Sequence, residues 1–493
     1  MVFEVLEEIC KKIGAKALKK GEKDDKYYID FDFRPFKKQD IELIQKELDE
    51  KAGGKYLIIS WSSSFVKELN KAAQRIYFKV FESKEEKEKF KKELEEKLKS
   101  DHIYLGEKLD LFHFEEELIG YGLPLFHFNG TIIRNELINF IREVNEELGY
   151  KEVFTPHLSK CELWKVSGHY DKYKDRMFIW KQDDEEYGLK PMNCPMHLQI
   201  FKFLPRSYKD LPFRIAEFAV VYRKEQSGEL HGLTRVYAIT QDDHHCILKE
   251  DQIEEEIEKI VKKTLEIYEK FGLKDVEVVL STRPDEFIGD IETWEKAENA
   301  LKNVLKRIFP NYKIAEKEGA FYGPKIDFLA KDSLNRKWQL TTIQLDFFMP
   351  KRFDITYTDK DNKEKHPIMI HFAILGSIER FMGVILEHFK GKLPIWLSPI
   401  QVAILPISEK YSDYAKEILN ECKKRKIRAE IYEEGTLEYR IRECEIKKIP
   451  YIVVVGKKEF ENKTLNVRYA GTQRELKINE FLKEIEDKIS KRL

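Results

Sequence analysis

Apolar positions recur along the chain at two spacings, one typical of helices and one typical of strands. In residues 1–100 they predict a first helix, a strand and a helix within KYYIDFDFRPFKKQDIELIQKEL, a strand at YLIISWSSS and a highly charged helix over Ser83–Ser100. Residues 101–396 mix the two spacings, and Pro394 and Pro399 interrupt the pattern near the end of this region. The pattern therefore predicts an α+β domain at residues 1–100 and a large mixed domain at 101–396.

The C-terminal region, residues 397–493, is organised differently. Its apolar runs VAILPI, RAEIYE and YIVVVG have strand character, and amphipathic helices are predicted between them at Tyr411–Lys424 and Leu437–Lys448. Such alternation is typical of a compact α/β domain. We therefore expect an α+β multidomain protein, because 493 residues exceed the roughly 250–300 that one hydrophobic core serves.

Residues 212–246, PFRIAEFAVVYRKEQSGELHGLTRVYAITQDDHHC, are predicted to form two strands joined by a loop. Because side chains alternate between the faces of a strand, Arg223 and Glu225 would share one face of the first strand. One face of the second strand would carry Arg235, Tyr237, Ile239, Gln241, Asp243 and His245. Polar groups gathered on one face indicate a binding site, and a half-solvated antiparallel hairpin is the alternative.

Composition narrows the class of protein only a little. The chain has 88 basic and 89 acidic residues, so its overall charge does not indicate a nucleic-acid partner. The basic run Lys423–Arg428 could contact phosphates or could be a solvated helix end. The six cysteines lack framework spacing and favour reduced thiols. With no membrane-length apolar run and no signal or transit pattern, we expect a cytoplasmic enzyme that makes no contact with membranes.

Several segments, in this order, resemble class II aminoacyl-tRNA synthetases, and threonyl-tRNA synthetase most closely. They are NCPMH, RKEQSGELHGLTR, TQDDHH, FYGPKID, TTIQLDF and HFAILGSIERF. The segment GTIIRNELINFIREVNEELGYKEVFTPHL resembles motif 1 of the class, a long helix, a turn and a strand, although an ordinary core helix would look similar. The resemblance implies an antiparallel catalytic core, a C-terminal anticodon-binding domain and a homodimer formed through motif 1.

The resemblance also implies that threonine is activated with ATP and Mg²⁺ and transferred to the 3′ end of tRNA(Thr). Guanidinium groups suit a triphosphate because they are permanently charged and bind oxygens in pairs. By resemblance, Arg223 contacts the α-phosphate, Glu225 the adenine amino group, and Arg380 of motif 3 both adenine and the γ-phosphate. Arg235 would lie at the far phosphates, and Ile239 stands where the family usually stacks an aromatic ring on adenine.

Cys194, His245 and His371 match the zinc ligands of the resembling family, which implies one Zn²⁺ per chain. Three protein ligands leave zinc a position for substrate. Taken alone, Cys194 could be an ordinary buried thiol and His371 a core histidine. Strand alternation favours His245 over its neighbour His244 as the ligand, and Phe372 stands where the family often has arginine.

A metal in this pocket has a physical reason. An apolar pocket separates threonine from the similarly shaped valine by only about 100-fold, whereas a site that binds the hydroxyl does far better. Asp243 is the candidate acceptor for the hydroxyl proton. The resemblance gives the remaining neighbours of the amino acid as Gln241, Tyr322, Lys325, Gln344 and Ser377.

The remaining functional assignments follow from the resemblance. His169, in SGHYDKY, would take part in transfer to tRNA, and imidazole has a pKa suited to proton transfer near neutrality. Glu459 and Arg468 would contact the anticodon, while Glu434 stands where asparagine is usual.

Residues 1–100 are expected to be a truncated remnant of an editing-type domain with a linker helix. KYYIDFDFRPFKKQDIELIQKEL and the segment around AAQRIY resemble only the two ends of that domain. Family members usually begin with a ubiquitin-like domain and an editing domain that contains H-x-x-x-H and C-x-x-x-H motifs. Residues 1–101 contain Cys10 and no histidine, so neither motif can occur there, and we expect no hydrolysis of seryl-tRNA.

Two other hypotheses remain. One is a class II synthetase of the same subgroup for proline, histidine or glycine, which would have no need for the Cys194, His245 and His371 set. The other is a catalytically silent paralogue that regulates through RNA binding, and Arg223 and Arg380 argue against it.

Overall fold

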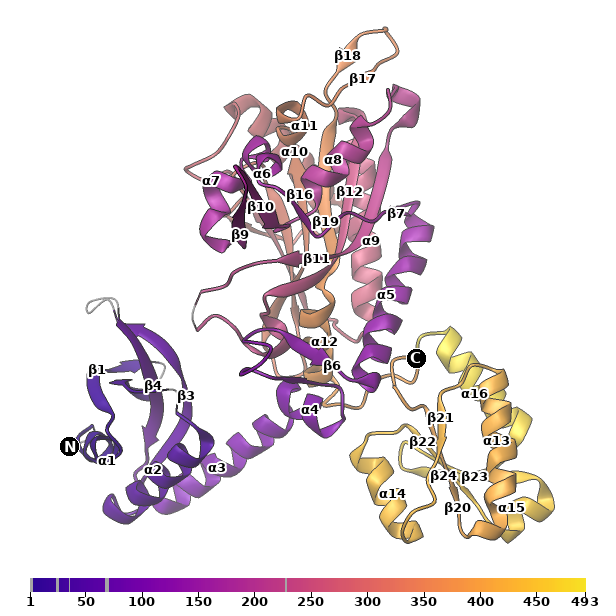
Figure 1. The fold of residues 1–493 in the computed structure, drawn as a ribbon. Helices are drawn as coiled ribbons and strands as arrows, with labels where there is room; N and C mark the ends of the chain where they lie inside the picture. Colours follow the sequence, from indigo (N-terminus) through magenta and orange to yellow (C-terminus); the bar gives the residue numbers. More distant parts are fainter. Residues whose placement is uncertain (1–2, 24–25, 35, 67–70, 227) are drawn as a thin grey trace. The chain divides into compact units, whose positions relative to one another are not determined.

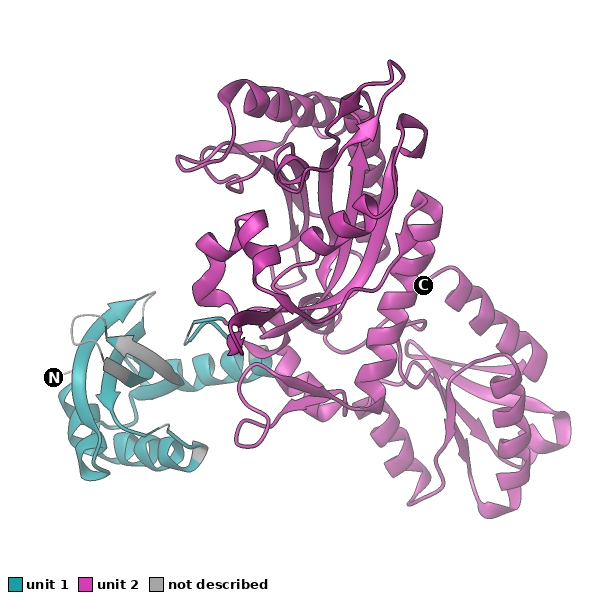
Figure 2. Cartoon of the chain, turned by 45° about the horizontal axis from the view of Figure 1, so that its top comes forward, with its two compact units in different colours: residues 1–99, 225–230 teal, residues 100–224, 231–493 magenta. Residues whose placement is uncertain are grey.

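The computed structural model (Figure 1) describes residues 3–23, 26–34, 36–66, 71–226 and 228–493. Two compact units are distinguished by their contacts (Figure 2). One contains residues 1–99 and 225–230, and the other residues 100–224 and 231–493. Among the described residues, no helix has both the length and the apolar character needed to cross a bilayer.

The first unit is a four-stranded antiparallel sheet in the order β1-β2-β4-β3, packed against two helices. Its elements are α1 (Glu4–Lys12), β1 (Lys16–Lys23), β2 (Lys26–Asp32), α2 (Lys38–Lys51), β3 (Tyr56–Val66), β4 (Lys71–Val80) and α3 (Lys84–Lys99). Leu6 of α1 and Ile44 of α2 pack on Phe31 and Phe78 of the sheet. The helices and strands expected from the sequence are present here, and β1 and β4 add to them.

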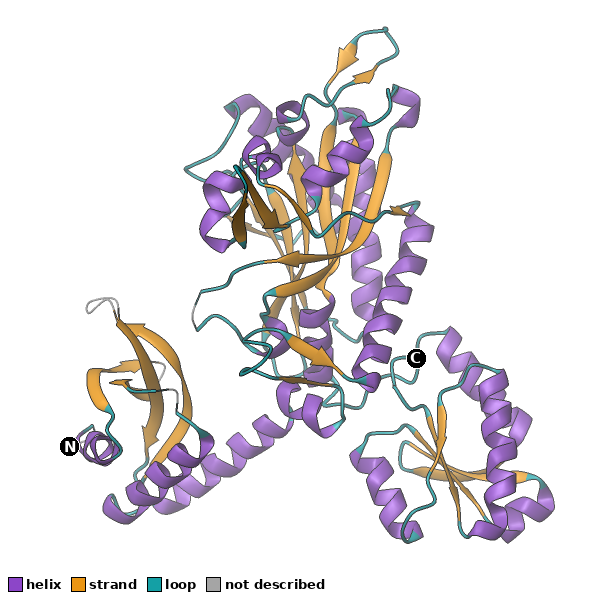
Figure 3. Ribbon diagram, in the orientation of Figure 1, coloured by secondary structure: helices purple, strands orange, loops and turns teal. Residues whose placement is uncertain are grey.

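The helices and strands in the first part of the second unit form the main sheet and the layers around it (Figure 3). They are α4 (His102–Lys108), β5 (Phe112–Phe114), β6 (Pro124–Phe126), α5 (Phe128–Leu148), β7 (Lys151–Glu152), β8 (Leu158–Lys160), α6 (Glu162–Ser167), α7 (His169–Tyr173), β9 (Ile179–Gln182), β10 (Glu185–Leu189), α8 (Cys194–Lys202), β11 (Phe213–Tyr222) and β12 (Ala238–Leu248). The chain continues with α9 (Ile253–Lys270), β13 (Val276–Ser281), α10 (Ile291–Ile308), β14 (Lys313–Ala315), β15 (Lys325–Lys331), β16 (Lys337–Asp346), α11 (Met349–Arg352), β17 (Tyr357–Thr358), β18 (Glu364–Lys365), β19 (Ile368–Ser377) and α12 (Ile378–His388).

The main sheet has eight strands in the order β14-β13-β15-β16-β19-β12-β11-β7. Its inner pairs are antiparallel, and only the edge strands β7 and β14 pair in parallel. One face is covered by α5, α9, α10 and α12, whose apolar side chains form a single core with alternate residues of the strands. The opposite face of the central strands is therefore available for polar side chains.

The hairpin of β11 and β12 is shorter than the sequence predicted. Its strands end at Tyr222 and begin again at Ala238, so Arg223, Glu225, Arg235 and Tyr237 lie outside them. The prediction that these residues occupy strand faces was wrong. After a last backbone bond from Arg223 to the Tyr237 carbonyl, the Tyr237 N–H bonds to the Gly122 carbonyl, which draws the chain out of the ladder.

The helix, turn and strand predicted for the motif 1 segment are present, but the strand is short. Helix α5 ends at Gly149, whose φ of 78° suits glycine, and β7 is only the pair Lys151–Glu152. The strand stops early because the Thr155 N–H bonds to the Glu217 carboxylate rather than to a neighbouring backbone.

The C-terminal part of the second unit is a five-stranded sheet in the order β21-β20-β22-β23-β24. Its elements are β20 (Val402–Pro406), α13 (Ser412–Lys424), β21 (Ala429–Ile431), α14 (Leu437–Ile446), β22 (Tyr451–Val455), α15 (Lys457–Asn462), β23 (Thr464–Tyr469), β24 (Thr472–Lys477) and α16 (Ile478–Ser490). Helices α13 and α16 pack on one face and α14 on the other, as expected from the alternating pattern.

The basic run at the end of α13, Lys423–Arg428, contains two arginines that bond to other parts of the protein. Arg428 donates to the Trp396 and Ser398 carbonyls and pairs with Glu136 at 2.7 Å. Arg425 pairs with Glu486 at 2.8 Å. These contacts give Arg428 a structural role. They do not decide whether the rest of the run contacts phosphates or is a solvated helix end.

Candidate metal and amino-acid site

Polar side chains from four neighbouring strands form one row across the main sheet. The register pairs Lys325 with Gln344, Gln344 with His371, and His371 with His245. The next residue after His371, Phe372, lies in the apolar core of the opposite face. Segments that are far apart in the sequence are therefore brought side by side by strand pairing.

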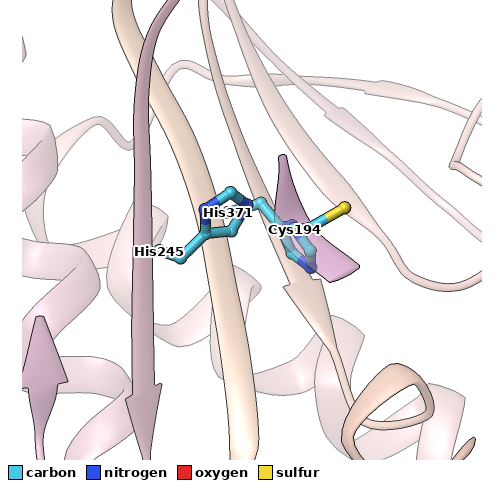
Figure 4. Close-up of side chains that lie close together, drawn as sticks. All are labelled: Cys194, His245 and His371. Atoms are coloured by element: carbon cyan, nitrogen blue, oxygen red, sulfur yellow. The ribbon is translucent and has the colours of Figure 1, made fainter. Parts of the chain in front are cut away.

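Cys194 joins this row as the first residue of helix α8. Figure 4 shows its side chain close to those of His245 and His371. Its sulfur and one ring nitrogen from each of His245 and His371 all lie within 4.8 Å of one another, and the three residues are buried. His244 points to the other face, where it bonds to Asn145 and stacks on Phe372 at 4.4 Å between ring centroids. The choice of His245 over His244 agrees with this geometry.

The chemistry of the three donors fits zinc. Burial raises the pKa of the Cys194 thiol well above its ordinary value, and nearby carboxylates act in the same direction. Burial, reinforced by neighbouring imidazoles, lowers the pKa of His245 well below its ordinary value. Such a thiol ionises only beside a cation, whereas a neutral imidazole already offers a lone pair. One thiolate and two imidazoles are donors that zinc prefers.

Asp243 lies beside this cluster, with its Oδ1 3.8 Å from the Nε2 of His245. Its other oxygen, Oδ2, accepts a hydrogen bond of 2.7 Å from the side-chain amide of Asn193. The carboxylate is therefore held in one orientation, with Oδ1 on the side of the cluster. Burial raises the pKa of Asp243, opposed by neighbouring imidazoles and by the Asn193 hydrogen bond.

Of the remaining residues expected around an amino acid, some lie beside the cluster and others bond to different partners. The Tyr322 hydroxyl donates to the Gln344 side chain at 2.7 Å, and the Tyr322 ring lies 5.6 Å from that of His371, so both are beside the cluster. Gln241 is paired with Ser377 across β12 and β19. Ser377 instead caps α12 by accepting from the Arg380 N–H, while Lys325 pairs with Asp327 at 2.8 Å.

The residues expected at a nucleotide come from strand ends, a helical turn and helix α12. Arg223 follows β11 and donates weakly to the Pro191 carbonyl, and Arg380 lies in the first turn of α12 and donates to the Thr234 carbonyl. Arg235 follows a short helical turn that ends at Thr234, and Ile239 is the second residue of β12. Glu225 belongs to the segment that groups with the first unit, and its role stays a prediction.

Comparison with known proteins gives a consistent result. Residues 170–389 match the family described as tRNA synthetase class II core domain (G, H, P, S and T), and residues 401–488 match the Anticodon binding domain family. The threonine–tRNA ligase catalytic subunit of Sulfurisphaera tokodaii is 53% identical over 417 residues, which cover 84% of this chain and 77% of that protein. The subunit with the same description from Saccharolobus solfataricus is 50% identical over 428 residues, covering 86% and 78%.

This chain belongs to the threonine–tRNA ligase family. A solved structure described as the RNA binding domain of threonyl-tRNA synthetase from Cryptosporidium parvum is 41% identical, with a TM-score of 0.76 over 78% of this chain and 98% of that one. The expected class II catalytic core and anticodon-binding domain are thus confirmed.

His169, the residue assigned by resemblance to the transfer step of the family, is fully buried at the start of α7. The Ser167 hydroxyl donates to the Trp164 carbonyl, so it accepts from Nδ1 of His169 at 2.8 Å. The lone pair therefore lies on Nε2, which has no hydrogen-bond partner among the described residues. Burial, with nearby positive charges adding, lowers the pKa of His169 to about 3, so the ring is neutral at neutral pH.

The two residues assigned to the anticodon lie in the C-terminal domain of this ligase-family chain. Glu459 caps α15 by accepting from the Gly456 N–H at 3.0 Å. Arg468 lies on β23, and its buried Nε has no hydrogen-bond partner among the described residues. Contact of Glu459 and Arg468 with the anticodon stays a prediction.

Three further residues beside the cluster were not singled out by sequence reasoning: Asn193, His197 and Glu217. Asn193 orients Asp243, and His197 connects Glu217 with His245. The NCPMH segment contained the first two, so closer attention to its polar members could have found them. Glu217 lies in an apolar strand and had no comparable signal in the sequence.

Proposed function

We propose that this chain is a threonine–tRNA ligase that holds zinc at Cys194, His245 and His371 and uses it to bind threonine. The observation that carries the proposal is the buried three-donor cluster beside the oriented carboxylate of Asp243. Metal analysis of the purified protein tests it, with one zinc per chain as the expected result. Full threonine activation by a metal-free preparation would contradict it.

Zinc, when bound, would supply a Lewis acid for the amino and hydroxyl groups of threonine. The chain itself would do the rest. Asp243 Oδ1 would accept the hydroxyl proton, because Oδ2 is occupied by Asn193. Tyr322 and Gln344 would border the bound amino acid, with Gln241 as a further contact, whereas Ser377 and Lys325 would act through Arg380 and Asp327. Valine would leave the Asp243 acceptor unpaired.

ATP would bind with Mg²⁺ beside the amino acid. Arg223 would polarise the α-phosphate for attack by the threonine carboxylate, and Arg380 and Arg235 would neutralise the more distant phosphates. Ile239 would form an apolar floor for adenine, and Glu225 would accept from the adenine amino group. Arginine suits these roles because it stays charged at every working pH.

We assign the transfer of threonine to the 3′ end of tRNA(Thr) partly to His169. Its Nε2 carries the lone pair and has no hydrogen-bond partner among the described residues, so it can accept a hydrogen bond from the ribose hydroxyl, although its pKa of about 3 makes it a weaker base than an ordinary imidazole. Glu459 and Arg468 would contact the anticodon, and the cytoplasmic location stays a prediction.

His169→Ala is expected to slow aminoacylation of tRNA roughly 100-fold, within the usual range for a general base, and to leave threonine-dependent pyrophosphate exchange within about threefold of wild type. The two steps separate because activation needs no proton transfer at the ribose. The control is His366→Ala. Within the described part of the chain His366 bonds only to the Ile355 carbonyl, so its removal should change neither rate. Equal losses in both assays would place His169 in the ATP or threonine site instead.

A homodimer formed through the motif 1 region is part of the proposal. Two large apolar side chains, one at the start of α5 and one just after β7, are exposed in the single chain, namely Phe128 at 90% and Phe154 at 80%. A dimer interface in this region would remove these apolar side chains from water.

The chain is further proposed to make seryl-tRNA that it does not hydrolyse. Serine has the same amino and hydroxyl groups as threonine, and one methyl group allows only about 10–200-fold discrimination. Residues 1–101 contain no histidine, and Cys10 is fully buried, with its pKa raised by burial to about 12. Neither motif of the editing domain is therefore present in this region.

The expected result with purified enzyme, serine and ATP is stable seryl-tRNA, and pre-charged seryl-tRNA should lose serine no faster than in buffer. Threonyl-tRNA under the same conditions is the control for spontaneous hydrolysis. Faster loss of serine than of threonine would mean that the chain has an editing site. Pyrophosphate exchange with each amino acid also distinguishes the proposal from a prolyl, histidyl or glycyl enzyme and from a silent RNA-binding paralogue.

A further inference from the structure

A buried chain of hydrogen bonds connects Glu217 to His245 of the three-donor cluster. Glu217 Oε2 lies 2.9 Å from Nε2 of His197, and Nδ1 of His197 lies 2.7 Å from Nδ1 of His245. The three residues come from β11, α8 and β12, and each is at most 3% exposed. Only His245 belongs to the three-donor cluster.

The positions of the protons follow from the chemistry of the end group. A carboxylate can only accept, so Nε2 of a neutral His197 must carry its proton and donate to Glu217. Nδ1 of His197 is then an acceptor, and Nδ1–H of His245 must donate to it. This leaves the lone pair of His245 on Nε2, the ring nitrogen on the side of Asp243.

The carboxylate at the far end is fixed from several sides. Glu217 accepts from the Thr155 N–H at 2.7 Å and from the Thr155 hydroxyl, and the Lys190 ammonium lies 3.4 Å away. Lys190 is itself bonded to Thr155 and is 1% exposed. The negative charge is therefore paired inside the protein, and Glu217 cannot turn away from His197 without leaving these donors unpaired.

We propose that His197 is a positioning residue that transmits the hydrogen bond of Glu217 to His245 and so fixes the tautomer in which His245 binds the metal. The inference rests on the proposed zinc site. The other histidine ligand has a simpler arrangement, because Nε2 of His371 lies 3.2 Å from the Asp346 carboxylate directly. Partners of this kind orient metal-binding imidazoles and increase their basicity.

His197→Leu is expected to weaken zinc binding roughly 10–100-fold, the usual loss when the partner of a metal-binding histidine is removed. The zinc dissociation constant is measured by competition with a chromophoric chelator, and the visible absorption of the Co²⁺-substituted protein reports ligand geometry. His197→Gln should stay within about threefold of wild type, because an amide can accept from His245 and donate to Glu217. His244→Leu is the matched control. His244 precedes His245 in the chain and is buried like His197, but it bonds to Asn145 on the other face of the sheet.

The outcomes separate this inference from the zinc site itself. If the wild-type chain binds no zinc, the proposed site fails. If the wild type binds zinc and His197→Leu binds it equally tightly, only the role of His197 is overturned, and an equal loss in His244→Leu would also overturn it. Should His197→Leu not fold, the double variant Glu217→Gln with Lys190→Met removes both charges together. It is expected to weaken zinc binding by at least about threefold, and unchanged affinity would contradict the proposal.

Discussion

Cys194→Ser is expected to remove zinc and threonine activation together, lowering kcat/KM in threonine-dependent pyrophosphate exchange at least roughly 100-fold, as when a preorganised electrostatic partner of the reaction is lost. A serine hydroxyl is a far poorer zinc ligand than a thiolate, and the two remaining imidazoles cannot complete the donor set. Zinc content by atomic spectroscopy and the exchange rate, both measured on the same preparation, check the result.

Cys246→Ser provides the matched control. Cys246 is also a fully buried thiol and follows His245 on β12, but it points into the apolar core of the opposite face. The same chemical change there should leave one zinc per chain and the exchange rate within about threefold, because surface and core changes that touch no ligand leave the site intact. Retention of full zinc and activity in Cys194→Ser would remove the sulfur from the proposed site.

Asp243→Asn is expected to reduce the discrimination of threonine over valine from roughly 10⁴–10⁵-fold, typical of sites that bind a substrate hydroxyl, to about 100-fold, typical of an apolar pocket. The Asn193 amide donates to the Oδ2 position, so an asparagine at residue 243 would place its oxygen there. Its NH₂ group would then occupy the Oδ1 position and present a donor where an acceptor is needed. The ratio of kcat/KM for the two amino acids in pyrophosphate exchange measures the effect.

The neighbouring carboxylate offers a control for this change. Asp242 faces the other side of β12, where its Oδ2 accepts from the N–H groups of Ile374 and Leu375. An asparagine can keep both bonds through its single oxygen, so Asp242→Asn should keep the threonine-to-valine ratio. A ratio that falls equally in both variants would mean that the strand had shifted, and an unchanged ratio in Asp243→Asn would exclude Asp243 as the hydroxyl acceptor.

Sequence patterns determined the helices and strands well where local forces dominate. The alternating C-terminal domain and the long helix α5 followed from apolar spacing. The spacing of residues on the buried face of a helix or strand is the same whichever element packs against that face. The limits of three strands did not follow, because distant partners set them. The β11–β12 hairpin ends where the Tyr237 N–H bonds to the Gly122 carbonyl, and β7 ends before Thr155, whose N–H bonds to the Glu217 side chain.

The three cluster residues, Cys194, His245 and His371, could be named from the sequence only through resemblance to a family, since no local spacing connects them. Strand alternation did separate His245 from His244. What the tertiary structure decided is the row across four strands, in which pairing brings Lys325, Gln344, His371 and His245 together.

The residues that orient the cluster ligands likewise could not be predicted from the sequence. Glu217 resembles any polar residue in an apolar strand until packing places it 2.9 Å from His197. Local propensity and period are properties of neighbouring residues, and they determined which segments form and which face each residue takes. Contacts between segments depend on how the sheet is ordered and in which register, so only the folded chain could decide which carboxylate orients which histidine.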